Sequence, residues 1–286
     1  MSIQINTQCI QCLLNKHLET ARALDESKAN AFCEELLQIL KDSLNGSNSA
    51  VVGAQVNQLY QKYFGLGQDR YVQEKMDSNA FVKPRLEAIT ALVEQQCDPV
   101  FAGLQFAILG NYLDFSALRG QVSFEKLDDM LHDALKMQLD AQVYRQFCED
   151  LEKGKKLLYI TDNAGEIGFD RVFAQQIQKK YPHLQITFCV RGLPAHNDAT
   201  REDAAYMGIT WPIVDTGNDI GGVEISMLSE KSKKALDAAD VVIAKGMGNT
   251  ESMYGCKYNV YYAFLVKCVR FETYFQKPHM HPMFIK

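Results

Sequence analysis

The sequence predicts an α/β protein, with a Rossmann-like open, mainly parallel sheet that follows a helical N-terminal domain. Helical periodicity runs from about residue 7 to residue 150, and short continuous apolar runs begin only after residue 156. Helical stretches separate those runs, which is the alternation typical of βαβ units. The change of character at Lys153-Gly154-Lys155 predicts a helical domain at 1–152 and a Rossmann-like α/β domain at 153–286.

In the N-terminal half, apolar residues recur at helical spacing, as in Phe32, Leu36 and Leu40. Residues 45–49 interrupt this pattern with Asn, Gly and Ser, which favour loops. Proline at the first position marks two further helices, since that position needs no backbone N–H donor. The helices expected after the loop are Pro84–Gln95, Pro99–Leu109 and, as one or two helices, Phe124–Cys148.

In the C-terminal half, three apolar runs predict strands that are buried on both faces, as in a parallel sheet. These runs are Leu157–Ile160, Ile186–Val190 and Val241–Ala244. The helices expected between and after them are Phe169–Lys180, Ala199–Met207 and Ile225–Ala238.

Composition excludes several classes of protein. The net charge of −5 over 286 residues provides no basic field for nucleic acid, so we expect no nucleic-acid partner. No segment approaches the roughly 20 apolar residues needed to span a bilayer, so we expect no membrane association. Residues 1–12 lack the pattern of a signal peptide, and the eight cysteines are scattered, which is typical of free thiols in a reducing compartment. We therefore expect a cytoplasmic location.

Ligands of open α/β sheets bind just beyond the carboxyl ends of the strands. The three loops that follow the predicted strands lie on the same sheet edge if the crossovers are right-handed. Their residues are Thr161-Asp162-Asn163-Ala164-Gly165-Glu166, Arg191 to Thr200, and Lys245-Gly246-Met247-Gly248-Asn249-Thr250-Glu251.

These loops supply oxygen ligands from Asp162, Asn163 and Asp198, an ammonium group from Lys245, and glycines that expose backbone N–H groups. Carboxylate and amide oxygens suit a hard divalent cation, and an ammonium group can bind phosphate as a point charge. Each feature has a simpler interpretation: Asp162-Asn163 and Asp198 could cap helices, and Lys245 could be solvated. Their joint occurrence at three strand ends favours a site.

Together the three loops resemble the damage-control phosphatases, a metal-dependent family formerly catalogued as a domain of unknown function. The resemblance rests on Asp162-Asn163-Ala164-Gly165-Glu166, Asn197-Asp198-Ala199-Thr200 and Lys245-Gly246-Met247-Gly248-Asn249, and it extends into the helical half at Asp98-Pro99 and Leu109–Phe115. The opening Cys9-Ile10-Gln11-Cys12 resembles the prokaryotic branch, whose N-terminus carries a CxxC motif.

The resemblance implies a divalent metal held by Asp162, Asn163 and Asp198, with substrate phosphate bound by Lys245 at a Lys-Gly motif that includes Gly246. It implies that Asn111 and Asp114, in a Gly-Asn-x-x-Asp motif, help to bind substrate. Members hydrolyse small phosphomonoesters, including sugar phosphates and damaged phosphorylated metabolites. The chain departs from the family after Lys267-Cys268, where the expected Gly-rich stretch is missing.

The sequence thus predicts a metal-dependent phosphatase of small phosphorylated metabolites, with Asp162, Asp198 and Lys245 as catalytic residues and Mg, Mn, Co or Ni as cofactor. Water is the favoured nucleophile, with aspartate as the alternative. A methyltransferase with Asp215 as ribose ligand, or a non-catalytic metal- or nucleotide-binding module, are the competing hypotheses. Cys9 and Cys12 are interpreted as core cysteines, because no second close pair completes a zinc site.

Overall fold

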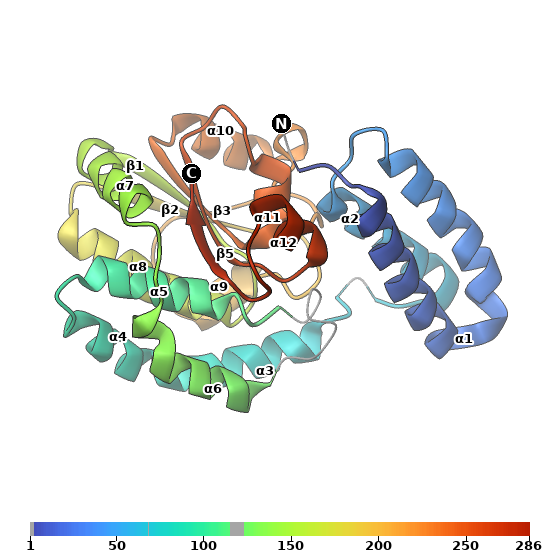
Figure 1. The fold of residues 1–286 in the computed structure, drawn as a ribbon, viewed down its shortest axis with the longest axis horizontal. Coiled ribbons are helices and arrows are strands. Elements are labelled where there is room, and N and C mark those ends of the chain that lie inside the picture. The colour runs from blue at the N-terminus through green and yellow to red at the C-terminus, as the bar shows by residue number, and fades with distance from the viewer. Residues whose placement is uncertain (1–2, 68, 115–122) are drawn as a thin grey trace.

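A six-stranded sheet forms the centre of the computed structural model, which describes residues 3–67, 69–114 and 123–286 (Figure 1). Its strand order is β3-β2-β1-β4-β5-β6, with all neighbours parallel except β5 and β6. This is the order of a Rossmann-like sheet extended by one antiparallel edge strand. The strands are β1 Lys156–Ile160, β2 Gln185–Val190, β3 Ile213–Asp215, β4 Val241–Lys245, β5 Val260–Leu265 and β6 Pro282–Ile285.

Helices cover both faces of the sheet, because alternate strand residues point to opposite sides. Leu157 and Tyr159 of β1 belong to one apolar core, whereas Leu158 and Ile160 belong to the other. The first core is covered by α4 Leu86–Glu94, α5 Pro99–Gly110, α7 Ala141–Lys153, α8 Glu166–Lys180 and α9 Arg201–Tyr206. The second is covered by α10 Glu230–Ala238, α11 Gly246–Met253 and α12 Val269–Phe275.

The first two helices form a lobe of their own, drawn in blue to one side of the sheet in Figure 1. Helix α1 spans Thr7–Ser43 and is broken at Asp25, and α2 spans Ser49–Phe64. Phe32, Leu36 and Tyr60 lie in a core of this α1–α2 lobe that is separate from the cores of the sheet. The remaining helical elements are α3 Val72–Val82, η1 Lys83–Arg85, α6 Phe124–Asp133, η2 Ala134–Lys136 and η3 Ile225–Met227.

The boundary between separately packed parts of the chain lies before residue 152. Helices α4, α5 and α7 share one core with the sheet, so these three helices pack as part of the α/β body. Within the predicted helical domain, the α1–α2 lobe has a core that is separate from the cores of the sheet. The boundary between 1–152 and 153–286 therefore marks the change from all-helical to alternating sequence, and the division of packing falls elsewhere.

The predicted α/β fold is confirmed, including the three predicted strands. The strands that sequence analysis missed are β3, which has three residues, the aromatic-rich β5, and β6, which begins with proline and replaces the expected Gly-rich stretch. The helix predicted at Ile225–Ala238 is interrupted after Met227 and resumes at Glu230. Within the described ranges, no helix combines the length and apolarity needed to cross a membrane.

Candidate active site

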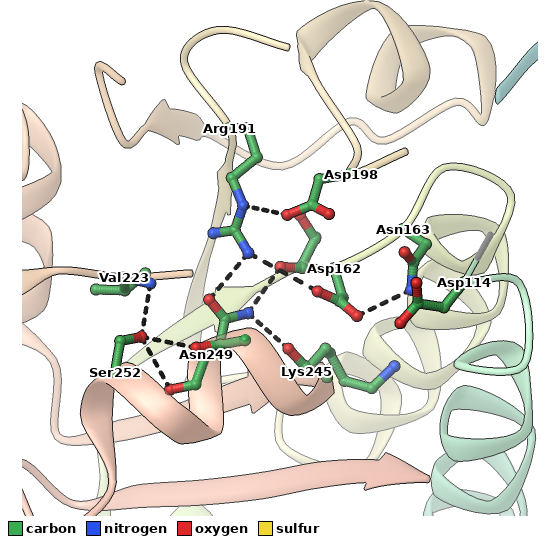
Figure 2. A network of polar contacts seen from close by, with 12 residues as sticks. Asp114, Asp162, Asn163, Arg191, Asp198, Val223, Lys245, Asn249 and Ser252 are labelled. Atoms are coloured by element: carbon green, nitrogen blue, oxygen red, sulfur yellow. Dashed lines mark hydrogen bonds and ion pairs between the residues drawn. The ribbon is translucent and has the colours of Figure 1, made fainter. Parts of the chain in front are cut away.

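The loops after β1 and β2 are joined edge to edge. Asn163 and Asp198 form an isolated antiparallel bridge. The Ala199 amide donates to the Asp162 carbonyl oxygen at 2.7 Å, and the Ala164 amide donates to the Asn197 carbonyl oxygen at 2.9 Å. These backbone bonds bring the predicted metal ligands from two strand ends into one place (Figure 2).

Both carboxylates are buried at the floor of one cavity, and each is held by donors from other elements. Asp162 Oδ2 accepts from Asn111 Nδ2 at 2.9 Å and from Asn163 Nδ2 at 2.8 Å. Asp198 Oδ2 accepts from Arg191 Nε at 2.5 Å. The carboxylates are therefore fixed in orientation before any ligand binds.

Burial and mutual repulsion make these carboxylates costly to ionise. Burial, followed by the negative charges of Asp198 and Glu166, raises the pKa of Asp162 well above its usual range. Burial also raises the pKa of Asp198 to about 6, although the Arg191 guanidinium opposes that shift. A cation at this position would relieve the repulsion, and the crowding of acids therefore fits a metal site.

The donor set fits a hard divalent cation. Asn163 and Asp198 are buried but line the cavity, and the hydrogen bonds among the described residues use Asn163 Nδ2 and Asp198 Oδ2, not the Oδ1 atom of either side chain. Across 3–67, 69–114 and 123–286, no group of three His, Cys, Asp or Glu side chains is arranged to hold a metal. The site thus depends on two carboxylates and one amide, which is a set of oxygen ligands that leaves room for water and substrate.

Arg191 is a residue of the site that sequence analysis left without a role. Arg191 directly follows Val190, the last residue of β2, and is 1% exposed. Its Nη2 donates to Asn249 Oδ1 at 3.0 Å, and Asn249 Nδ2 in turn donates to the Thr161 carbonyl oxygen at 3.0 Å. This network ties α11 to both ligand loops. An arginine directly after an apolar strand and before an acid-rich loop was the available signal.

Lys245 does not lie at the cavity, contrary to the predicted phosphate contact. Its ammonium group is fully buried and donates at 2.7 Å to Glu166, to Asp170 and to the Ala107 carbonyl oxygen. Burial acts to lower the pKa of Lys245, but the two carboxylates outweigh it and raise the pKa. Strand alternation is the reason: position 245 points to the same face as Ile243, under α5 and α8.

Gly246 makes space for Asp162. It adopts φ 79°, and a Cβ atom at this position would lie 2.0 Å from Asp162 Oδ2. A side chain is therefore excluded by both the backbone conformation and the carboxylate. The residue was predicted to contact substrate, whereas its evident role here is to let the metal-ligand carboxylate approach the backbone.

Lys267, which follows β5, lines the cavity together with Lys16, although the side chain of Lys267 is itself 0% exposed. Lys267 Nζ donates to Asp114 Oδ2 at 2.6 Å and to the Asn111 carbonyl oxygen at 2.8 Å, and both Lys267 and Asp114 line the cavity. Asn111 is fully buried and acts through Asp162 and Glu166, to which its amide donates. Of the two residues predicted to bind substrate in the helical half, Asp114 reaches the cavity wall.

The cavity measures about 620 Å³ and is closed on one side by the α1–α2 lobe. Helix α1 contributes these residues to its wall: Gln8, Cys9, Gln11, Cys12, Leu13, Asn15, Lys16 and His17. Cys12 is exposed, contrary to its interpretation as a core cysteine, whereas Cys9 is partly buried and packs against the core of the α1–α2 lobe. The N-terminal lobe therefore supplies the wall that faces the predicted metal ligands.

Comparisons with known proteins agree with this fold. Residues 5–277 match the model of the damage-control phosphatase ARMT1-like domain. The uncharacterised protein MJ0202 of Methanocaldococcus jannaschii is 32% identical, with 93% of this chain and 90% of that protein covered. A damage-control phosphatase of Archaeoglobus fulgidus is 28% identical, with 88% of each chain covered.

A third relative connects sequence with a solved structure. The damage-control phosphatase PH1575 of Pyrococcus horikoshii is 25% identical, with 88% of this chain and 86% of that protein covered. The crystal structure of PH1575, described as a DUF89 family protein, superposes with a TM-score of 0.83 at 24% identity and covers 99% of both chains. The chain belongs to the damage-control phosphatase ARMT1-like domain family.

Proposed function

We propose that this protein is a metal-dependent phosphatase that hydrolyses small phosphomonoesters, such as sugar phosphates, nucleotides or damaged phosphorylated metabolites. One observation carries the proposal: Asp162, Asn163 and Asp198 meet from two strand ends and line one cavity, which Lys267 also lines. Two relatives named damage-control phosphatases support hydrolysis as the activity.

The proposed metal ligands are Asp162, Asn163 and Asp198, and Mg, Mn, Co or Ni are the candidate ions. A divalent cation bound there supplies charge neutralisation and lowers the pKa of water. One carboxylate oxygen of Asp162 accepts a hydrogen bond from Asn111, and one of Asp198 accepts a hydrogen bond from Arg191. These bonds favour a role as rigid ligands, and water is therefore the proposed nucleophile in place of either aspartate.

Lys267 is the proposed phosphate-binding residue, in place of Lys245. Lys267 lines the cavity and its buried ammonium group pairs with Asp114, so phosphate binding would exchange part of that ion pair for a phosphoryl oxygen. The cavity volume of about 620 Å³ suits a metabolite and excludes a folded macromolecule. The net charge of −5 further disfavours nucleic acid as a partner. The free thiols are in keeping with a cytoplasmic location as part of the proposal.

The test is hydrolysis of p-nitrophenyl phosphate with each metal in turn and with EDTA as the control. Asp162→Ala and Asp198→Ala should each reduce kcat/KM at least about 100-fold, the scale at which a single fixed electrostatic group acts in catalysis. Asp215→Ala is the matched control, because Asp215 also ends a strand but pairs with Arg201 and does not line the cavity. Parent-level turnover by both Asp162 and Asp198 variants would disprove the assignment.

The transferase alternative is less well supported. Asp215, its proposed ribose ligand, accepts from Arg201 Nε at 2.8 Å and does not line the cavity. Calorimetric titration with a methyl donor in the absence of metal distinguishes the two functions, since tight binding would favour the transferase. Metal-dependent turnover that EDTA abolishes would exclude a purely non-catalytic binding module.

A further inference from the structure

His196 has a backbone conformation that histidine normally avoids. It lies at φ 49°, two residues before Asp198. The turn is closed around it by a bond of 3.0 Å from the Asp198 amide to the Ala195 carbonyl oxygen. On the other side, Asn197 Nδ2 donates to the Leu113 carbonyl oxygen at 2.7 Å. The loop that positions the metal ligand therefore also holds His196 in a strained state.

Two glycines give the imidazole its space. A Cβ atom at Gly53, inside α2, would lie 2.9 Å from His196 Nε2, and one at Gly221 would lie 3.1 Å from Cδ2. Glycine inside a helix carries an entropic cost, so the α1–α2 lobe gives up stability at this contact. The ring also packs edge-on against Tyr71, with centroids 6.0 Å apart. The fold is thus built around this side chain from three elements.

The imidazole nevertheless has no hydrogen-bond partner within the described residues. Its Nδ1 is buried without a partner, and Nε2 makes no recorded bond although His196 lines the cavity. A strained polar residue that the protein leaves unsatisfied at a ligand cavity needs an explanation beyond packing. An uncharged imidazole offers one donor and one acceptor, which matches a hydroxyl group.

Two further uncharged polar side chains line the same cavity. Gln11 and Asn15 come from α1 and line the cavity with His196. Amide side chains, like neutral imidazole, can both donate and accept. The lining thus offers several partners for uncharged polar groups, alongside charged residues such as Lys16 and Arg270.

We propose that His196 selects the substrate by hydrogen bonding to a hydroxyl group on its non-reacting part, while Asp162, Asn163 and Asp198 act on the phosphate end. This inference rests on the proposed phosphatase function and adds a residue that discriminates among phosphomonoesters. A site that bonds a substrate hydroxyl discriminates against an analogue that lacks it, because its polar groups are then left unpaired. His196 is therefore expected to favour hydroxylated substrates over aryl phosphates.

The test compares kcat/KM for a panel of pentose and hexose phosphates with kcat/KM for p-nitrophenyl phosphate, in metal-replete wild type and variants. His196→Gly removes the imidazole and relieves the backbone strain. It should lower the ratio of kcat/KM for the sugar phosphates to kcat/KM for p-nitrophenyl phosphate about tenfold. His196→Asn, which tolerates the same conformation and keeps a polar group, should restore part of that ratio. Gln276→Gly is the matched control, because Gln276 also has a positive φ (53°) but lies outside the cavity wall.

The outcomes separate the two proposals. A melting temperature of His196→Gly at or above that of wild type, together with the lower ratio, supports substrate selection. An unchanged ratio, or a wild type that hydrolyses the aryl phosphate but no hydroxylated phosphate, overturns the inference and leaves the phosphatase proposal intact. A wild type that hydrolyses neither class with any metal overturns both.

Discussion

Asn163 and Asp198, 35 positions apart in the chain, pair as an isolated antiparallel bridge. The bridge aligns two loops whose side chains carry the proposed metal ligands, so the ligand geometry is set by backbone hydrogen bonds. Asp162 and Asp198 are consequently held close together although they repel each other.

Metal binding should stabilise the fold through this site. With metal at about 100 times its Kd, mass action adds roughly 2.7 kcal/mol, which corresponds to a rise in Tm of roughly 5–10 °C for a chain of this size. The rise should be absent in Asp198→Asn and retained in Asp215→Asn, as measured by thermal unfolding with and without Mn²⁺. An equal rise in both variants would contradict the ligand assignment.

Substitution of the two buried lysines, Lys245 and Lys267, should affect stability and catalysis differently. Lys245→Met leaves Glu166 and Asp170 without their shared cation, and breaking a buried ion pair costs about 3–5 kcal/mol. Lys267→Met also removes a buried lysine from an ion pair, with the partly exposed Asp114, and it should in addition lower kcat/KM at least about 100-fold. Urea unfolding and aryl phosphate kinetics, measured on both variants, separate the roles. Equal catalytic loss from a fully stable Lys245→Met would restore the original prediction for Lys245.

Gly246→Ala should damage both stability and activity. The new Cβ would lie 2.0 Å from Asp162 Oδ2 in addition to the strain of φ 79°. Gly65→Ala isolates the strain, because Gly65 has φ 64° and open space around it. The control should lose about 1 kcal/mol, and Gly246→Ala should lose more and also lose metal-dependent turnover. Similar losses in the two variants would show that contact with Asp162 is unimportant.

Stability should depend on pH through Glu251. Burial raises its pKa to about 7, while its carboxylate accepts from Ser49 at the start of α2. Because the folded pKa exceeds the ordinary glutamate value of 4.5, the stabilisation is complete below about pH 4.5 and is lost as pH rises through about 7. Glu251→Gln should therefore gain stability relative to wild type between pH 5 and pH 8.

The expected gain is on the order of 3 kcal/mol at most, given about 1.4 kcal/mol for each pKa unit. Urea unfolding at the two pH values measures it, with the exposed Glu152→Gln as control. A difference between wild type and Glu251→Gln that does not change with pH would mean that Glu251 titrates normally.

The sequence by itself determined the fold class and predicted the loops that carry the proposed metal ligands. Apolar runs such as Val241–Ala244 indicate buried parallel strands, and parallel strands place the residues after them at one sheet edge. That rule is local and general, so it identified Asp162, Asn163 and Asp198 without knowledge of packing. Short or irregular strands such as β3 and β6 give too weak a pattern for the same rule.

Only the tertiary structure decided which lysine reaches the cavity and what forms its outer wall. Lys245 lies one peptide beyond Ala244, yet strand alternation turns its ammonium group to the α8 face, where two carboxylates bind it. Lys267 and His196 gain their positions from contacts with Asp114 and Gly53, which are more than 140 residues away in the chain. Local sequence fixes where a strand ends, but long-range packing fixes which way each side chain points, because that direction depends on partners that the local pattern does not contain.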